Sequence, residues 1–141
     1  MATYLNGVKN IYNGNVDLLT DTIKMVLVKG TYTPSQTTDE TYADILAHVS
    51  TGTGITARGQ AIDNKTITVD TGNLRTIFDA DDEVFATITT TDVRWIVLYK
   101  DTGTDGTSYL LSWYDLGQQS VTGVSLEGIV AATGLIASIV N

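Results

Sequence analysis

The chain contains no cysteine, a single proline, Pro34, and a single histidine, His48. Without cysteine, neither a disulfide nor a thiolate metal ligand can hold the fold together. A Ser-His-Asp triad would have to use His48, because it is the only imidazole. Lys and Arg number 8 against 16 Asp and Glu, so the net charge is −8. This balance argues against nucleic acid as a partner, since phosphate binding depends on cationic side chains.

Long hydrophobic runs are also missing. The longest apolar stretch, residues 129–140, is interrupted by Thr133 and Gly134, and it falls short of the roughly 20 residues that a membrane-spanning helix needs. We expect two short strands on either side of a glycine turn there. The first residues lack the basic and apolar regions of a secretory signal, so we expect no membrane partner.

The remaining pattern is that of a β protein. Short apolar or alternating segments are separated by Gly, Asp and Asn turns, and they predict strands at 23–28, 65–70, 74–78, 84–89, 93–100, 109–114, 121–126 and 135–140. Apolar residues at helical spacing, Tyr42, Ile45, Leu46 and Val49, predict one short helix over 39–49. The sequence therefore predicts a mainly β, single-domain antiparallel β-sandwich or jelly-roll-like barrel with one short helix. Residues 1–15, rich in Asn and Gly, are expected to be a flexible N-terminal arm, and residues 16–141 the β-sandwich domain.

The aromatic residues concentrate in two bulky strands joined by a Thr/Gly/Asp turn, with Asp105-Gly106 as a hairpin signal. The four that matter most are Trp95, Tyr99, Tyr109 and Trp113. Strict alternation would place Trp95 and Tyr99 on one face, and Trp113 with Tyr109 and Leu111 on one face. Two interpretations remain: packing in the core or at a subunit interface, and an exposed platform on which a sugar stacks.

No set of residues in the sequence indicates a catalytic or metal-binding site. His48 is expected to be a surface or edge histidine, and the segment 123–128 departs from the hydrolase pattern G-x-S-x-G at Glu127. The acidic residues 79–83 are candidates for a Ca²⁺ site but lack the loop pattern of a known one. The turn 101–106 is an incomplete ion loop, because Ser112 stands where a bidentate glutamate is needed. We therefore expect no catalytic, cofactor or metal site, and a chain that is not an enzyme.

Several blocks of the sequence, in order, resemble a widespread group of small virion structural proteins of tailed bacteriophages. The blocks are residues 21–28, 32–34, 42–45, 51–60, 78–82, 94–104 and 110–117, and the resemblance spans residues 16–140. It implies a head decoration (cement) protein, which binds the outer surface of the assembled capsid and stabilises it across subunit boundaries.

The same resemblance implies the partners and the place of action. The major capsid protein is the expected partner, with self-association into a homo-oligomer, for which a trimer is the first expectation. The protein is expected on the outer surface of the phage head after synthesis in the host cytoplasm. The arm could order on binding, and its apolar and aromatic residues Tyr4, Leu5, Val8, Ile11 and Tyr12 are the expected capsid contacts. The alternatives are a tail or baseplate subunit and a carbohydrate-binding adhesion module.

Overall fold

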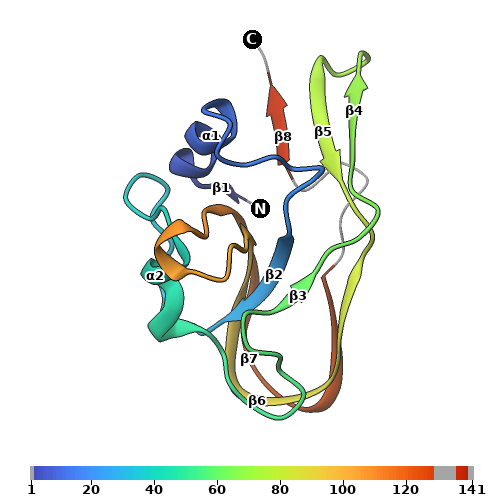
Figure 1. The fold of residues 1–141 in the computed structure, drawn as a ribbon. Coiled ribbons are helices and arrows are strands. Elements are labelled where there is room, and N and C mark those ends of the chain that lie inside the picture. Colours follow the sequence, from blue (N-terminus) through green and yellow to red (C-terminus); the bar gives the residue numbers. More distant parts are fainter. Residues whose placement is uncertain (1, 129–135, 140–141) are drawn as a thin grey trace.

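The computed structural model describes residues 2–128 and 136–139 (Figure 1). Strands dominate, every strand pairing is antiparallel, and the fold is β-sandwich-like. This confirms the predicted fold class. None of the helices in the described residues is long and apolar enough to cross a membrane.

The large sheet has five strands in the order β1-β7-β6-β2-β3. These are β1 (Ala2–Thr3), β7 (Leu110–Gly128), β6 (Glu83–Lys100), β2 (Ile23–Val28) and β3 (Gln60–Ala61). The strand β2 lies inside the sheet, between β6 and β3, and apart from Lys24 it is buried along its whole length, as its continuous apolar run predicts. Successive residues of β2 and β6 enter two different core clusters, one on each face of the sheet.

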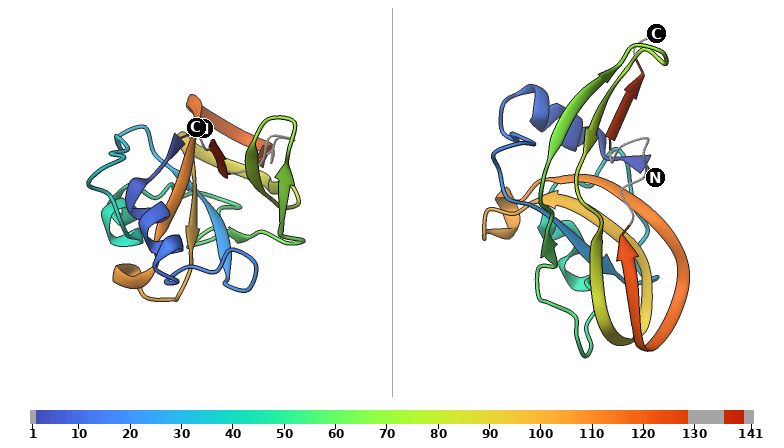
Figure 2. Two further views of the ribbon diagram at one scale, coloured as in Figure 1. Left: turned by 90° about the horizontal axis from the view of Figure 1, so that it is seen from above. Right: turned by 90° about the vertical axis from the view of Figure 1, so that its right-hand side faces the viewer.

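The small sheet has three strands in the order β4-β5-β8: β4 (Thr66–Asp70), β5 (Arg75–Asp79) and β8 (Ile136–Ile139). It extends beyond one end of the large sheet, and β4 forms its outer edge (Figures 1 and 2). Near the base of the small sheet, Phe78 joins the core cluster of the large sheet. β8 falls within the second of the two strands expected over 129–140, whereas the first lies outside the described residues.

Each of the two longest strands replaces two expected ones. The segments 84–89 and 93–100 form the continuous strand β6, and 109–114 and 121–126 belong to β7. The β6–β7 pairing contains several register irregularities, and Thr87 has φ 51°. These bulges let both strands of the hairpin bend without interrupting their pairing (right panel of Figure 2). For this reason the turn-like residues in the middle of the hairpin led to a wrong prediction of strand ends there.

The described residues contain two short α-helices where one was expected. The predicted helix corresponds to α2 (Tyr42–Ile45) and the 3₁₀ turn η1 (Leu46–His48), and Asp44 accepts hydrogen bonds from the backbone N–H groups of Glu40 and Thr41 at its start. A second 3₁₀ turn, η2 (Asp105–Thr107), lies in the β6–β7 connection.

The second helix, α1 (Leu5–Tyr12), corrects the prediction of a flexible arm over residues 1–15. The segment forms β1, which pairs with β7, followed by α1, which packs on the same strand. Gly7 allows this contact, because a Cβ atom at that position would overlap the backbone of Leu110. The Asn/Gly-rich composition therefore reflects close helix–strand packing and capping, and the boundary at residue 16 has no counterpart in the fold.

Candidate functional site

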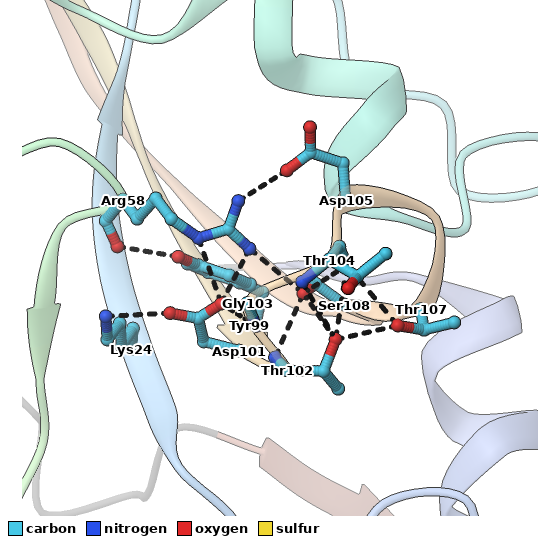
Figure 3. A network of polar contacts seen from close by, with 10 residues as sticks. All are labelled: Lys24, Arg58, Tyr99, Asp101, Thr102, Gly103, Thr104, Asp105, Thr107 and Ser108. Carbon is cyan, nitrogen blue, oxygen red and sulfur yellow. Dashed lines mark hydrogen bonds and ion pairs between the residues drawn. The ribbon is translucent and has the colours of Figure 1, made fainter.

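An ion network joins three distant segments of the large sheet (Figure 3). The carboxylate of Asp101 accepts hydrogen bonds from Arg58 at 2.6 and 3.0 Å and pairs with Lys24 at 2.7 Å. Arg58 also pairs with Asp105, and its guanidinium lies over the ring of Tyr42. The Asp101 side chain is only 8% exposed, so its charge is balanced inside the protein and not by water.

The electrostatics of the network follow from this arrangement. Burial alone would raise the pKa of Asp101, but the hydrogen bonds from Arg58 and Lys24 hold that pKa well below its ordinary value. The hydrogen bond to Asp101 likewise raises the pKa of Arg58. Burial raises the pKa of the Tyr99 hydroxyl. The carboxylate of Asp101 and the guanidinium of Arg58 are therefore both ionised at neutral pH.

The backbone of Arg58 is part of the same arrangement. Arg58 and Gly59 have φ 62° and 70°, and the hydroxyl of Tyr99 donates a 2.6 Å hydrogen bond to the carbonyl of Arg58. A Cβ atom on residue 59 would overlap the carbonyl oxygen of Met25, so only glycine fits there. This tight turn places the guanidinium beside Asp101 and leads directly into β3.

Hydroxyl groups fix the connection that carries Asp105. Ser108 Oγ accepts hydrogen bonds from Arg58 and from the N–H of Thr102, and it donates to the carbonyl of Thr104 at 2.8 Å. The hydroxyls of Thr102 and Thr107 lie 2.7 Å apart. The turn 101–106, considered above as an ion loop, thus has its Asp side chains bound to Arg58 and Lys24. These contacts indicate that the ion network stabilises the fold.

A shallow open hollow of about 440 Å³ lies beside the ion network. Its lining includes Leu46, Val49 and Ile55, with Tyr42 and Arg58 on one side. Of its polar lining residues, Arg58 and Asp105 are paired with each other in the network, and Ser50 donates a hydrogen bond to the carbonyl of Asp92. The hollow therefore offers an apolar surface and no arranged chemical group.

The residues expected to contact a capsid divide between core and surface. Tyr4 is fully buried, with its hydroxyl 2.9 Å from that of Tyr32, and burial raises its pKa. Val8 and Ile11 are partly buried, and Ile11 packs against the core. Leu5 and Tyr12 are exposed, Tyr12 by 79%. Only these two present apolar surface to a partner.

The hairpin aromatics pack mainly in the core. Trp95 is 8% exposed and donates a 3.0 Å hydrogen bond from its indole to the carbonyl of Tyr32, and Tyr99 is fully buried. Tyr109 and Trp113 are partly buried against the two core clusters. Trp95 and Tyr99 therefore belong to the core and offer no exposed stacking platform.

One detail of the alternation is wrong. Trp113 packs with Tyr4 and the Trp95 cluster, with ring centroids of Tyr4 and Trp113 4.5 Å apart, whereas Tyr109 and Leu111 belong to the opposite cluster. The cause is a register irregularity between the pairs Leu98–Ser112 and Tyr99–Leu110, which shifts the period-two alternation.

The remaining motifs have plain structural surroundings. His48 is half-buried in η1, with Nδ1 3.1 Å from the hydroxyl of Thr31. Residues 123–128 lie inside β7, so Ser125 sits in a strand and not at a strand-to-helix turn. The Ser125 hydroxyl accepts a hydrogen bond from the N–H of Thr87.

The acidic segment 79–83 lies where β5 leads into β6. Asp81 donates a backbone hydrogen bond to the carbonyl of Asp63 and accepts one from the Asn64 amide. Burial, with the nearby carboxylates of Asp63 and Asp81, raises the pKa of Glu83. Among residues 2–128 and 136–139, no group of three or more His, Asp or Glu side chains is arranged to hold a metal ion.

Charge is distributed unevenly over the described residues. Six of the eight cations, Lys9, Lys24, Arg58, Arg75, Arg94 and Lys100, form ion pairs. Asp63, Asp79, Asp81 and Glu83 have no cationic partner among the described side chains. The junction between the two sheets is therefore strongly acidic.

The small sheet carries the most exposed aliphatic residues of the described chain. Val69 and Leu74 are 72% and 71% exposed, and Ile67 is also exposed. Leu74 has φ 52°, a conformation that costs a residue with a Cβ about 1 kcal/mol or more. Apolar side chains this exposed and clustered are typical of an interaction surface. Sequence reasoning missed this surface, because Val69 and Leu74 read as ordinary strand residues.

No protein-family model matches the chain, and neither a curated protein nor a solved structure matches it.

Proposed function

We propose that the chain is a non-enzymatic decoration (cement) protein of a tailed-phage head, which binds the outer surface of the assembled capsid across subunit boundaries. The observation that carries the proposal is the small sheet, which extends beyond the large sheet and exposes Ile67, Val69 and Leu74 to solvent. The resemblance of seven ordered blocks to tailed-phage virion proteins supplies the identity of the partner, the major capsid protein.

Such a protein stabilises a shell by burying surface that spans neighbouring subunits. It binds the assembled state better than free subunits, so mass action favours the shell. A specific contact needs at least roughly 1,000 Å² of total buried surface, and a rigid binder loses less entropy on docking. The ion network and the two core clusters supply this rigidity.

The charge distribution predicts the chemistry of the receiving surface. The acidic junction at Asp63, Asp79, Asp81 and Glu83 lies at the base of the small sheet, where Asp79 pairs with Thr66, and Val69 and Leu74 lie toward the other end of that sheet. We therefore expect an apolar capsid surface flanked by Lys or Arg, to which binding weakens as salt concentration rises. The exposed residues Leu5 and Tyr12 of α1 provide a second, fixed contact in place of the flexible arm.

The decisive experiment is electron cryomicroscopy of the virion that encodes this chain. Density that fits the fold on the outer capsid face at subunit junctions would support the proposal. Density confined to the tail would overturn the head assignment and support the tail or baseplate alternative.

A binding experiment on heads stripped of this protein tests the contact itself. Added protein should raise the temperature at which the heads disrupt, and Leu74→Lys should weaken this effect by about tenfold in the concentration required. The matched control is Leu19→Lys, which changes an exposed leucine outside the small sheet. Equal loss for both variants, or no loss for either, would contradict the assigned surface.

A further inference from the structure

The outer edge of β4 is long and unprotected. No strand among the described residues pairs with it, and the side chains from Thr66 to Val69 are all exposed. Its five pairs with β5 run without a register shift. The strand contains neither proline nor lysine, and the preceding Lys65 is turned away to bind the carbonyl of Asp21. Proteins use short strands, bulges, proline or charges to block such edges.

The edges of the large sheet carry these devices. The outermost strands of the large sheet, β1 and β3, have two residues each. The part of β7 beyond β1 is interrupted by Gly117 and Gly123, with φ 72° and 62°, and by irregular pairing with β6. Among the strands whose side-chain burial is described, only β4 combines length, regularity and exposure at an edge. An edge of this kind is a site for addition of another strand.

We infer that β4 pairs with β4 of a second copy of this chain, antiparallel and about a two-fold axis through Thr68. In this register Thr68 faces itself, and Ile67 faces Val69 of the second copy. The two exposed aliphatic residues of each copy thus become cross-strand neighbours on one face of a continuous sheet of two small sheets. Directly opposed aliphatic pairs stabilise antiparallel sheets.

The charged residues in and beside β4 are compatible with a second copy of the chain as the partner. In the same register Thr66 faces Asp70, and Lys65 faces Thr71, so no two like charges oppose each other. If the two-fold axis passed through Ile67 instead, Val69 would face Lys65 of the second copy. If it passed through Val69, Ile67 would face Thr71 of the second copy. The Thr68 register is therefore the one in which both aliphatic residues find apolar partners.

The net charge of −8 on each copy predicts a distinctive salt response. Two acidic copies repel each other, and salt screens the repulsion. Self-association should therefore tighten as NaCl rises from about 0.05 M to about 0.5 M, opposite to the response expected for a basic partner. The inference does not depend on the proposed function, because it concerns the purified protein alone.

The test is the mass of the full chain in solution, measured by light scattering across a dilution series. We expect a monomer–dimer equilibrium, which Val69→Lys weakens by about tenfold or more in the dissociation constant. Val124→Lys is the matched control, since it makes the same charge change at an exposed valine of β7. The Val69 side chain is mostly exposed in the single chain, so its replacement should leave the melting temperature unchanged at dilutions where the protein is a monomer.

Cross-linking tests the register independently. The chain has no cysteine, so Thr68→Cys introduces the only thiol, and oxidation should yield a disulfide-linked dimer. Thr122→Cys, at an exposed threonine of β7, should yield none.

Each other outcome overturns the inference. A monomer at all concentrations excludes the contact, and a trimer excludes it because a two-fold contact closes with two copies. A dimer that Val124→Lys weakens as much as Val69→Lys has its interface elsewhere. A dimer without the Thr68→Cys cross-link has another register. The trimer expected from the sequence stays a prediction, which the same measurement decides.

Discussion

The two sheets of this protein use their residues in opposite ways. In the large sheet, charges and aromatic rings are turned inward, as in the Asp101 network and the Trp95 hydrogen bond. In the small sheet, aliphatic side chains are turned outward on β4 and on the turn that follows it. The difference indicates that the large sheet contributes most of the buried contacts, whereas the small sheet carries the exposed residues to which we have assigned a contact.

The comparison also shows where the chain tolerates strain. Positive φ at Arg58 is compensated by the ion network and by the hydrogen bond from Tyr99. Positive φ at Leu74 lies in the β4–β5 turn, where Asp70 accepts hydrogen bonds from the N–H groups of Gly72 and Asn73.

The largest expected effect comes from breaking the network. Asp101→Asn removes a buried carboxylate and leaves Lys24 without its partner and Arg58 with only Asp105. We expect the free energy of unfolding at pH 7 to fall by about 3 kcal/mol, measured by urea denaturation. The control is Asp115→Asn, which breaks the exposed pair with Arg94 and should cost far less. Similar losses for both variants would show that burial of Asp101 contributes little.

A smaller effect is expected from pH. The pKa of Asp101 is depressed in the folded state, so the unfolded state binds its proton first as pH falls. The stability that Asp101 contributes is complete above the ordinary aspartate pKa of about 3.9 and is lost as pH falls from there through the lower folded pKa. The stability difference between the wild type and Asp101→Asn should therefore shrink below about pH 4. A difference that stays constant into strong acid would contradict this assignment.

The smallest effect is expected in the small sheet, with opposite sign. Leu74→Gly removes the Cβ from a left-handed residue and should stabilise the fold by up to about 1 kcal/mol, measured by thermal unfolding. Val69→Gly, in regular strand conformation, should instead destabilise it by about 0.5–1 kcal/mol. Destabilisation by Leu74→Gly would show that this leucine packs usefully within its own chain.

Local patterns predicted the strands because period-two and continuous apolar runs report burial directly. The run 23–28 gave β2, and the aromatic segments around residues 95 and 113 gave the central hairpin. The helix α1 escaped prediction, because Gly7 and Asn10 are poor helix formers whose roles are tertiary. Gly7 permits contact with β7, and Asn10 binds the carbonyl of Asn6 and the carboxylate of Glu40.

The site was less predictable than the fold. Lys24, Arg58 and Asp101 come from three segments far apart in the chain, and only folding brings them together. One signal was present: Lys24 interrupts an otherwise apolar run in a central strand, and a cation there needs an anionic partner. Which carboxylate supplies it could not be read from spacing. The exposure of Val69 and Leu74 depends on the position of the small sheet, which no local pattern encodes.

The pairing of Ala2 with Trp113 has a consequence for synthesis of the protein. The first strand must wait for its partner until most of the chain has left the ribosome, and Tyr4 cannot reach its buried position before then. The β6–β7 hairpin, in contrast, joins segments that are close in sequence and can form as it emerges. We expect the nascent chain to begin folding at the hairpin and to close its N-terminal segment last, because contacts between distant residues form slowly. Premature termination before β7 would thus release a chain in which β1 and Tyr4 lack the strand against which they pack.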